Sequence, residues 1–461
     1  MIGSELTKKI LNTLLKNGAD FSEIFVQKRI SGILRLDDSK IDNSSSGYEL
    51  GCGLRLWAGD STFYAYVDSL QKEKLLDAAK VLSSAVNGTS SIKVMDLTSA
   101  KSSYHTDIKK FPERISQDTK KDILESADRK SRDFSPYIIQ VTANLSDVTE
   151  EVYIANSNGI SSYEEKVKTF LGINVVAKKK TEVRTGYKSL AKTSGYEIFD
   201  IKGPEKVALE ASEIAVKMLD AVGAPAGELP VVIGPAFGGV IFHEACGHGL
   251  EADAVMKDAS VFKGQIGKKI ASDIVTAADD STIKYLWGSY KFDGEGCPSS
   301  KTVLIKDGIL TSYIYDLRTS VKLKAKQTGN GRRQSFRDVP IPRMSNTYIA
   351  NGKQDKSSII KSVNRGIYAK EFAGGQVDPA TGDFVFGISE GYLIENGKIS
   401  FPIKGATLIG NGLAILKKIE AVGNDLDFAP GICGKNGQAV SNEVGQPTIK
   451  VSRMTVGGTG S

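Results

Sequence analysis

The chain has 461 residues, more than one hydrophobic core usually serves, so we expect two domains. Apolar residues make up 40% and charged residues 25% of the sequence, as is ordinary for a soluble globular protein. The net charge of +6 is small beside 60 basic and 54 acidic residues, and no long basic run occurs, which argues against a nucleic-acid-binding protein.

Helices and strands are both predicted in the first half of the chain. Apolar residues at helical spacing predict helices over residues 4–18, 69–82, 116–132 and 204–223. Alternating patterns predict a hairpin over 22–36 that turns at Ser31-Gly32, and a second over 49–67 that turns at Gly59. Further strands are expected at 137–145, 151–155 and 166–177, after a polar connection over 87–112. The pattern predicts an N-terminal α+β domain, residues 1–222, with an antiparallel sheet and helices.

The second half has a different predicted secondary structure. Helical periodicity is largely lost beyond a linker-like stretch at 221–228 (AVGAPAGE). Short β-like runs dominate, and glycine turns such as Asp307-Gly308 and Asn396-Gly397 separate them. They lie at 302–305, 310–315, 388–394, 404–409 and 448–452. Residues 327–343, rich in arginine, are expected to form an ordered loop over a site. We therefore predict a mostly antiparallel β domain over residues 228–461, and an α+β fold class for the whole chain.

Cysteine content and hydropathy indicate the cellular compartment of the protein. Its cysteines, Cys52, Cys246, Cys297 and Cys433, lie far apart without a CxxC pair, which favours a reducing compartment. The first 15 residues lack the uninterrupted apolar stretch of a signal peptide. The most apolar segment, 229–242, is too short to span a bilayer and contains two prolines. We expect a cytoplasmic protein.

The histidines carry the most information. Only three occur in the chain, and His243 and His248 lie five residues apart with Glu244 between them. Imidazole is the commonest metal-binding side chain, and a carboxylate beside a metal-bound water can act as its base. This HExxxH pattern therefore indicates a metal-dependent hydrolase. Ordinary helical histidines, or a purely structural zinc site closed by four protein ligands, are the competing interpretations.

The spacing of the two histidines has a structural consequence. In HExxH the imidazoles are four residues apart and nearly share a helix face, whereas five residues rotate about 140° on a regular helix. A π-bulge, or unwinding at the end of the helix, would bring His243 and His248 back together. Gly247 and Gly249 flank His248 and make either distortion easier.

A third metal ligand is not fixed by spacing. Cys246 lies within the motif, but the geometry that converges the imidazoles would turn it toward the core, where free cysteine is common. Cys297 is a remote alternative. Residue chemistry leaves the choice open among Cys433, which lies in a glycine-framed loop, and the nearby carboxylates Glu251 and Asp253.

Several motifs resemble the TldD/TldE (PmbA) family of zinc metallopeptidases, on the TldD side, over nearly the whole chain. They are PAFGGVIFHEACGHGLEAD at 235–253, PRMSNT at 342–347, EGYLIE at 390–395, KGATLIGNG at 404–412 and GICGKNGQ at 431–438. The resemblance implies that His243, His248 and Cys433 bind Zn²⁺ and that Glu244 is the base. It also implies a heterodimer with a TldE/PmbA-like partner, or a homodimer, that admits extended or unfolded peptides. Charge and hydropathy, by contrast, are the grounds on which we expect neither a nucleic-acid nor a membrane partner.

Four further residues are candidate substrate contacts. Arg337 and Arg343 could bind a carboxylate, since guanidinium suits planar anions, and Asn346 and Gln438 could orient substrate. Structural ion pairs and turn hydrogen bonds are the alternative roles. We predict a zinc-dependent peptidase acting on unfolded or small precursor peptides. The alternatives are a non-enzymatic regulator or scaffold, of the gyrase-modulator kind, with a structural zinc, and a zinc amidase acting on a non-peptide amide.

Overall fold

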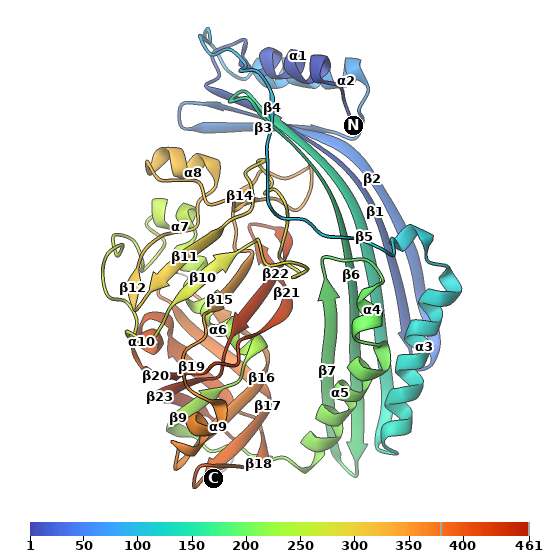
Figure 1. The fold of residues 1–461 in the computed structure, drawn as a ribbon, viewed down its shortest axis with the longest axis vertical. Helices are drawn as coiled ribbons and strands as arrows, with labels where there is room; N and C mark the ends of the chain where they lie inside the picture. The colour runs from blue at the N-terminus through green and yellow to red at the C-terminus, as the bar shows by residue number, and fades with distance from the viewer. Residues whose placement is uncertain (379, 460–461) are drawn as a thin grey trace.

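Long, continuous hairpins dominate the first half of the chain in the computed structural model, which describes residues 1–378 and 380–459 (Figure 1). Within that described part, seven strands form the first sheet, in the order β3-β2-β1-β5-β6-β4, and β7 also pairs with β6. All its pairs are antiparallel except β4 with β6. The strands are β1 (Phe21–Asp37), β2 (Lys40–Ala58), β3 (Ser61–Val67), β4 (Thr98–Ser99), β5 (Ile138–Asn156), β6 (Ile160–Lys179) and β7 (Glu182–Lys192).

Helices cover the two ends of this sheet and bury two separate cores. At one end α1 and α2 pack on β1 and β2, and at the other α3 and α5 pack on β5 and β6. Each helix presents one apolar face, so burial of that face, more than local propensity, stabilises it. The helical segments are α1 (Ser4–Leu15), α2 (Lys72–Ser83), η1 (Pro112–Arg114), α3 (Gln117–Phe134), α4 (Ile198–Ile201), α5 (Pro204–Lys217) and η2 (Met218–Asp220).

Two large sheets and one two-stranded sheet arise from the second half, again counting only described residues. The six-stranded sheet has the order β12-β11-β10-β15-β22-β21, and a pairing of β16 with β17 closes part of the eight-stranded sheet into a ring. The six strands are β10 (Ala277–Asp280), β11 (Lys301–Lys306), β12 (Ile309–Leu310), β15 (Asn346–Ile349), β21 (Asp427–Lys435) and β22 (Gln438–Gln446). The eight are β8 (Val222–Gly223), β9 (Gly227–Ile233), β16 (Arg365–Val377), β17 (Asp383–Glu395), β18 (Lys398–Lys404), β19 (Thr407–Asn411), β20 (Ile419–Val422) and β23 (Ile449–Gly457).

One large core joins these two sheets and encloses the helical segment around His243. Short elements complete this half of the chain: α8 (Leu317–Lys322), α9 (Lys356–Lys361), α10 (Gly412–Lys417), and the pair β13 (Gly331–Arg332) with β14 (Ile341–Pro342). The segment 327–343 is otherwise loop, as expected. The α+β class and the antiparallel character of both halves are confirmed, whereas the domain limits 1–222 and 228–461 stay predictions.

Several sequence predictions were wrong in detail, three of them within residues 1–228. The expected turn at Ser31-Gly32 lies inside β1, because β2 and β5 pair with that strand along nearly its whole length. The strands expected at 137–145 and 151–155 are one strand, β5. The linker at 221–228 is partly strand, since β8 pairs with β18 and β9 begins at Gly227.

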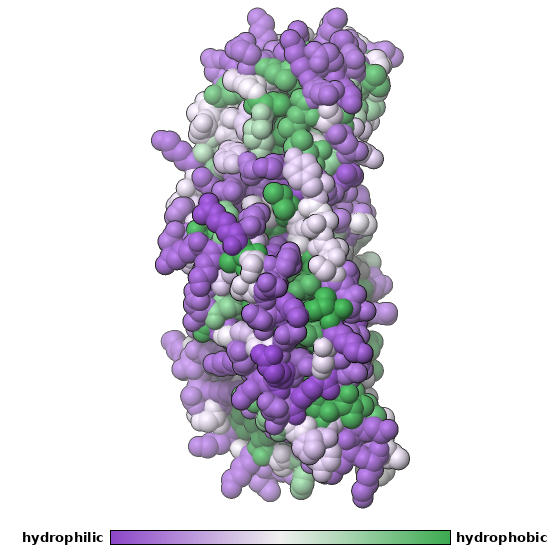
Figure 2. Space-filling model, turned by 90° about the vertical axis from the view of Figure 1, so that its right-hand side faces the viewer, coloured by the Kyte–Doolittle hydropathy of each residue, from purple (hydrophilic) through white to green (hydrophobic). Residues whose placement is uncertain are grey.

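The outer side of the molecule is mixed in character. On the face toward the right of Figure 1, hydrophilic residues separate small apolar patches along the whole length (Figure 2). Across residues 1–378 and 380–459, none of the helices combines the length and apolar character needed to cross a membrane.

A buried ion network ties the first sheet to the second half of the chain. Arg55 on β2 lies 2.6 Å from a Glu23 oxygen and 2.7 Å from a Glu295 oxygen, and Arg333 also pairs with Glu23. Nearby, the Asp293 carboxylate accepts three backbone N–H bonds. Carboxylates outnumber guanidinium groups here, and burial raises the pKa of Asp293 to about 7 and that of Glu295 to about 8.

The two carboxyls of this network are predicted to contribute a fall in the free energy of unfolding as the pH rises from about 5 to about 8. In the unfolded chain these two carboxyls release their protons near pH 4, whereas the folded chain retains them until about pH 7 to 8. The native state therefore binds more protons in this window, and each group contributes a decline of at most about 1.4 kcal/mol per pH unit. Urea unfolding at a series of pH values measures the slope.

Two variants sharpen this measurement. Glu295→Gln, which has no such proton to lose, should show a shallower decline. Asp60→Asn should keep the wild-type slope, because a hydrogen bond from Lys322 lowers the pKa of that exposed carboxyl, which titrates below the window. A decline as steep in Glu295→Gln as in the wild type would contradict the assignment.

Candidate metal centre

The histidine segment is a short run of helical turns after β9. It passes through η3 (Ala236–Gly239), α6 (Val240–Phe242), η4 (His243–Gly247), η5 (His248–Leu250) and α7 (Ala252–Met256). The η4 turn is a π-helix, which confirms the predicted bulge. A π-turn places residues five apart on one face, so the imidazole rings of His243 and His248 come to 5.1 Å between centroids.

Gly247 is required for a different reason from the one the sequence suggested. Its backbone is ordinary helix, at φ −56° and ψ −48°, so the bulge needs no special glycine conformation. A Cβ at this position would lie 2.2 Å from the Met344 sulfur. The glycine therefore lets the loop after β14 approach the histidine turn closely.

Cys433 completes the group from a strand. It lies on β21, opposite Val440 on β22, and its Sγ is 3.4 Å from Nε2 of His248. Ligand atoms of His243, His248 and Cys433 all lie within 4.8 Å of one another. The sequence placed Cys433 in a loop, but the chain turns only at Asn436-Gly437, where both residues have positive φ, as in a tight hairpin.

These donors fit a zinc ion. Tetrahedral zinc with Zn–N near 2.1 Å and Zn–S near 2.3 Å separates neighbouring ligand atoms by about 3.5 Å. The 3.4 Å between Cys433 and His248 matches that spacing. If all three held an ion, a fourth position would be left for water, which is the pattern of catalytic rather than structural zinc sites.

The Cys433 thiol is prepared to act as a ligand. Burial alone would raise its pKa, but hydrogen bonds and charge from His243 and His248 lower it to about 4. By contrast, burial raises the pKa of Cys52 to about 12 and also raises that of Cys246. The thiolate, the form that binds metal, is therefore favoured at Cys433.

Glu251 lies behind His248 instead of beside the ion position. One of its carboxylate oxygens is 3.0 Å from Nδ1 of His248 and 2.8 Å from Nζ of Lys435, and Lys435 also pairs with Asp253 at 2.6 Å. Burial would raise the pKa of Glu251, but Lys435 and His248 hold it well below its usual range. The two carboxylates weighed as ligands thus form an ion cluster, and Glu251 directs Nε2 of His248 toward Cys433.

This arrangement predicts a metal-affinity defect in Glu251→Gln. Loss of the carboxylate behind His248 weakens the orientation and basicity of that ligand, so we expect metal affinity to fall about 10- to 100-fold. Competition with a chromophoric chelator measures the change. Asp253→Asn, which alters the same cluster without touching His248, is the matched control and should bind metal nearly as wild type. Equal affinities in all three proteins would refute the positioning role.

His243 is contacted by a residue that the sequence did not single out. Asn442 on β22 places its Nδ2 3.3 Å from Nδ1 of His243, and the His243 side chain is fully enclosed. Asn442 lies two residues beyond Val440, the partner of Cys433, so it shares the face of the hairpin that carries the thiol. Alternation along β22 was the signal that could have found it.

Glu244 lies at the rim of the group. Its carboxylate is 3.7 Å from Nε2 of His248, the ring nitrogen that faces Cys433. The side chain keeps 31% of its surface exposed, whereas Glu251 has none. The Glu244 carboxylate therefore lies beside the convergent donors and is in contact with solvent.

The four predicted substrate contacts lie in different settings. Arg343 is buried and donates to the carbonyl oxygens of Cys433 and Gln438, at 2.6 and 3.2 Å, so it braces the β21–β22 hairpin. Gln438 bonds the loop at Gln334 and Val339. Asn346 is buried and bonds Gly288, Asp280 and Ser289. Arg337 is exposed and pairs with Glu49 and Asp68. Contact with substrate stays a prediction for all four.

An α+β fold that brings a His₂Cys donor set and a rim glutamate together defines a candidate metallohydrolase. Family profiles match the PmbA/TldA metallopeptidase domain 1 at residues 22–86, the central domain at 110–219 and the C-terminal domain at 226–458. The metalloprotease TldD homologue of Haemophilus influenzae is 37% identical over 99% of this chain and 97% of its own. A Methanothermobacter thermautotrophicus metalloprotease is 34% identical over 94% of each chain. The chain therefore belongs to the PmbA/TldD metallopeptidase family.

Solved structures agree on the fold. TldE from Thermococcus kodakarensis has a TM-score of 0.76 at 21% identity, covering 95% of this chain and 97% of its own. A Thermotoga maritima protein described as a proposed modulator of a DNA gyrase has a TM-score of 0.79, also at 21% identity, covering 95% and 96%. At this identity the likeness concerns the fold alone.

Proposed function

We propose that this protein is a zinc-dependent peptidase that hydrolyses peptide bonds of unfolded or small precursor peptides. His243, His248 and Cys433 would hold the ion, and Glu244 would act as general base. The convergence of two imidazoles and a low-pKa thiol beside an accessible carboxylate carries this proposal. Membership of a metallopeptidase family supports it.

The chemistry divides between the ion and the chain. When bound, zinc supplies Lewis acidity that makes a water more acidic and polarises the scissile carbonyl. Glu244 takes a proton from the attacking water and delivers it to the leaving amine nitrogen, which prevents that nitrogen from departing as an anion. Glu251 keeps His248 oriented, and Asn442 and Arg343 hold His243 and the Cys433 strand in place.

An extended backbone suits the surroundings of the site. Among the described strands, β21 pairs only with β22, so no strand occupies its other edge near Cys433. A substrate strand added at this edge would be held chiefly by its main chain, which gives affinity with little side-chain selectivity. This favours unfolded or extended peptides over folded proteins.

A second subunit would complete the enzyme. We propose a heterodimer with a TldE/PmbA-like partner, or a homodimer, that encloses the site and admits only extended chains. The likeness to a TldE fold supports a partner of similar architecture. Purification from the native host followed by mass spectrometry would distinguish the two assemblies. The cytoplasmic location stays a prediction.

Metal analysis joined to a peptide-cleavage assay tests the function. We expect about one zinc per chain, loss of peptide hydrolysis after chelation, and recovery when zinc is returned. The alternative is a non-enzymatic regulator or scaffold with a structural zinc, and the gyrase-modulator description of a structural neighbour keeps this class in view. Zinc removal that unfolds the protein, with no hydrolysis of any peptide beforehand, would favour that alternative. Cleavage of non-peptide amides alone would favour an amidase.

A further inference from the structure

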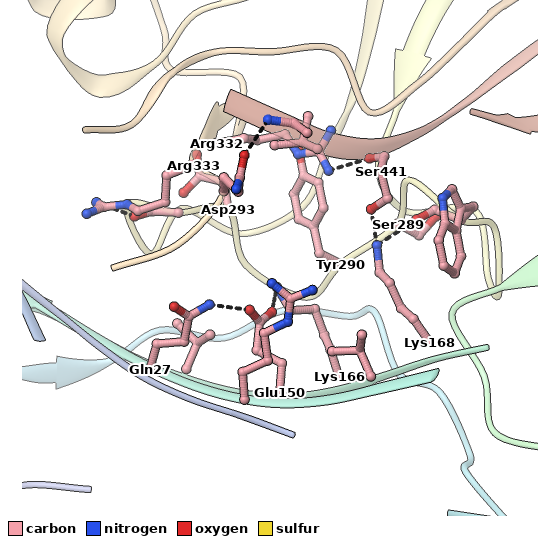
Figure 3. A pocket seen from close by; sticks show the side chains of 18 of the residues that line it. Gln27, Glu150, Lys166, Lys168, Ser289, Tyr290, Asp293, Arg332, Arg333 and Ser441 are labelled. Atoms are coloured by element: carbon pink, nitrogen blue, oxygen red, sulfur yellow. Dashed lines mark hydrogen bonds and ion pairs between the residues drawn. The ribbon is translucent and has the colours of Figure 1, made fainter. Parts of the chain in front are cut away.

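A second feature, separate from the metal centre, is a cavity of about 320 Å³ between the first sheet and the second half of the chain (Figure 3). One wall is formed by side chains of β1, β5 and β6. The opposite wall comes from the loops around residues 287–294 and 332–334 and from the β21–β22 hairpin. Both halves of the chain therefore contribute groups that face the same space.

Positive charge exceeds negative charge on these walls. Five basic side chains line the cavity, namely Arg29, Lys166, Lys168, Arg332 and Arg333, against two acidic ones, Glu150 and Asp293. The acidic groups are already engaged. Glu150 lies 3.0 Å from Lys166 and also bonds Gln27, and Asp293 accepts backbone N–H groups. Three of the basic groups also have acidic partners, Arg29 with Glu49, Lys166 with Glu150 and Arg333 with Glu23. Among the described residues, Lys168 and Arg332 are the two cations of this cavity without an ion-pair partner.

Lys168 and Arg332 are the two basic residues of the cavity whose charge is not balanced by a carboxylate. Nζ of Lys168 donates to the backbone oxygen of Trp287 at 2.7 Å and to the Ser441 hydroxyl. Arg332, which is buried, donates to the backbone oxygens of Met344 and Ser441. Within the described residues, no carboxylate lies within 4.0 Å of either cation. The two cations are close to each other, because Lys168 donates to the hydroxyl of Ser441 and Arg332 to its backbone oxygen.

Two neighbouring cations such as Lys168 and Arg332 raise the free energy of the folded protein when no counter-ion is present. A charge removed from water needs a partner of opposite sign, and two like charges near each other add repulsion. Burial, with Lys166 and Arg332 nearby, holds the pKa of Lys168 well below its usual range, the direction that uncompensated positive charge produces. An anion in the cavity would relieve both effects.

We propose that this cavity binds a compact oxyanion, a phosphate or a carboxylate, between Lys168 and Arg332. The guanidinium offers a planar fork of donors and the ammonium a mobile point charge, a combination suited to oxyanions. The site is distinct from the metal centre. Side chains alternate along a strand, so Cys433 faces His248, while Ile432 and its cross-strand neighbour Ser441 face the cavity. The inference does not rest on the proposed peptidase activity.

Calorimetric titration of the full chain with inorganic phosphate tests this site. We expect saturable binding, and a Kd at least about tenfold weaker in Lys168→Met, since a hydrogen bond to a charged group is lost. Lys179→Met is the matched control, because Lys179 lies on the same strand but pairs with Asp220 outside the cavity. It should bind phosphate as wild type does. Arg332→Lys, which keeps the charge but loses the fork, should also weaken binding.

A second measurement keeps the inference testable if a variant folds poorly, and it identifies the source of the anion. Phosphate should raise the thermal unfolding midpoint of the wild type but not that of Lys168→Met, because a ligand stabilises the state that binds it. An acetylated dipeptide with a free C-terminal carboxylate is compared with its amide. Preference for the carboxylate over both amide and phosphate would assign the cavity to a peptide terminus. Failure of phosphate and carboxylate alike to bind the wild type, or equal binding by Lys168→Met, would overturn the proposal.

Discussion

Replacing Glu244 by glutamine is expected to slow peptide hydrolysis severely while leaving zinc content at the wild-type level. The amide keeps the shape of the side chain but cannot accept the proton of the attacking water. General base catalysis typically contributes about 10²- to 10⁴-fold, so kcat should fall by that factor. Zinc should remain bound, since Glu244 is 3.7 Å from His248 and is not a member of the convergent donor group.

The measurement pairs turnover of an unfolded peptide with zinc analysis of the same sample. Glu420→Gln is a suitable control, because Glu420 is an exposed residue that pairs with Lys450 on the eight-stranded sheet. It removes one carboxylate without approaching the centre and should keep full activity. An active Glu244→Gln enzyme would remove the general-base role, and a zinc-free one would show that Glu244 serves the metal instead.

The histidine turn could be predicted from the sequence because its information is local. Two imidazoles five residues apart cannot share a face of a regular helix, so a common ligand demanded either a bulge or an unwound end. The structure has the bulge. The reason for Gly247 was not accessible in the same way, because Met344, which it accommodates, lies almost a hundred residues along the chain.

Other features could not be predicted either, because they depend on contacts between residues that are distant in the sequence. Ser31-Gly32 has the composition of a turn, yet β1 continues through it because strands on both sides supply hydrogen bonds. The loop expected around Cys433 is a hairpin, and Asn436-Gly437 was the local signal that favoured one. The carboxylates Glu251 and Asp253 looked like ligands by proximity in sequence, and only the position of Lys435 shows that they form an ion cluster.

Cys433→Ala is the variant expected to remove the metal itself. It takes away one of three protein ligands, and the one that carries negative charge, so zinc affinity should fall by more than the roughly 100-fold that loss of an outer partner causes. Cys246→Ala is the matched control: Cys246 lies within the histidine motif but packs in the apolar core, where burial raises the pKa of its thiol. That variant should keep both zinc and activity.

Cobalt substitution distinguishes a lost ligand from a damaged fold. A thiolate bound to Co²⁺ gives a sulfur-to-metal charge-transfer absorption, which should be present in the wild type and in Cys246→Ala but absent in Cys433→Ala. Cys433→Asp, which restores an anionic donor of a type that zinc accepts, should recover part of the metal affinity without that absorption. Suppose instead that Cys433→Ala kept both zinc and the charge-transfer absorption, and that Cys246→Ala lost the absorption. The ion would then be bound by Cys246, on the other side of the π-turn. The geometry from which Glu244 was assigned as the base would then no longer hold.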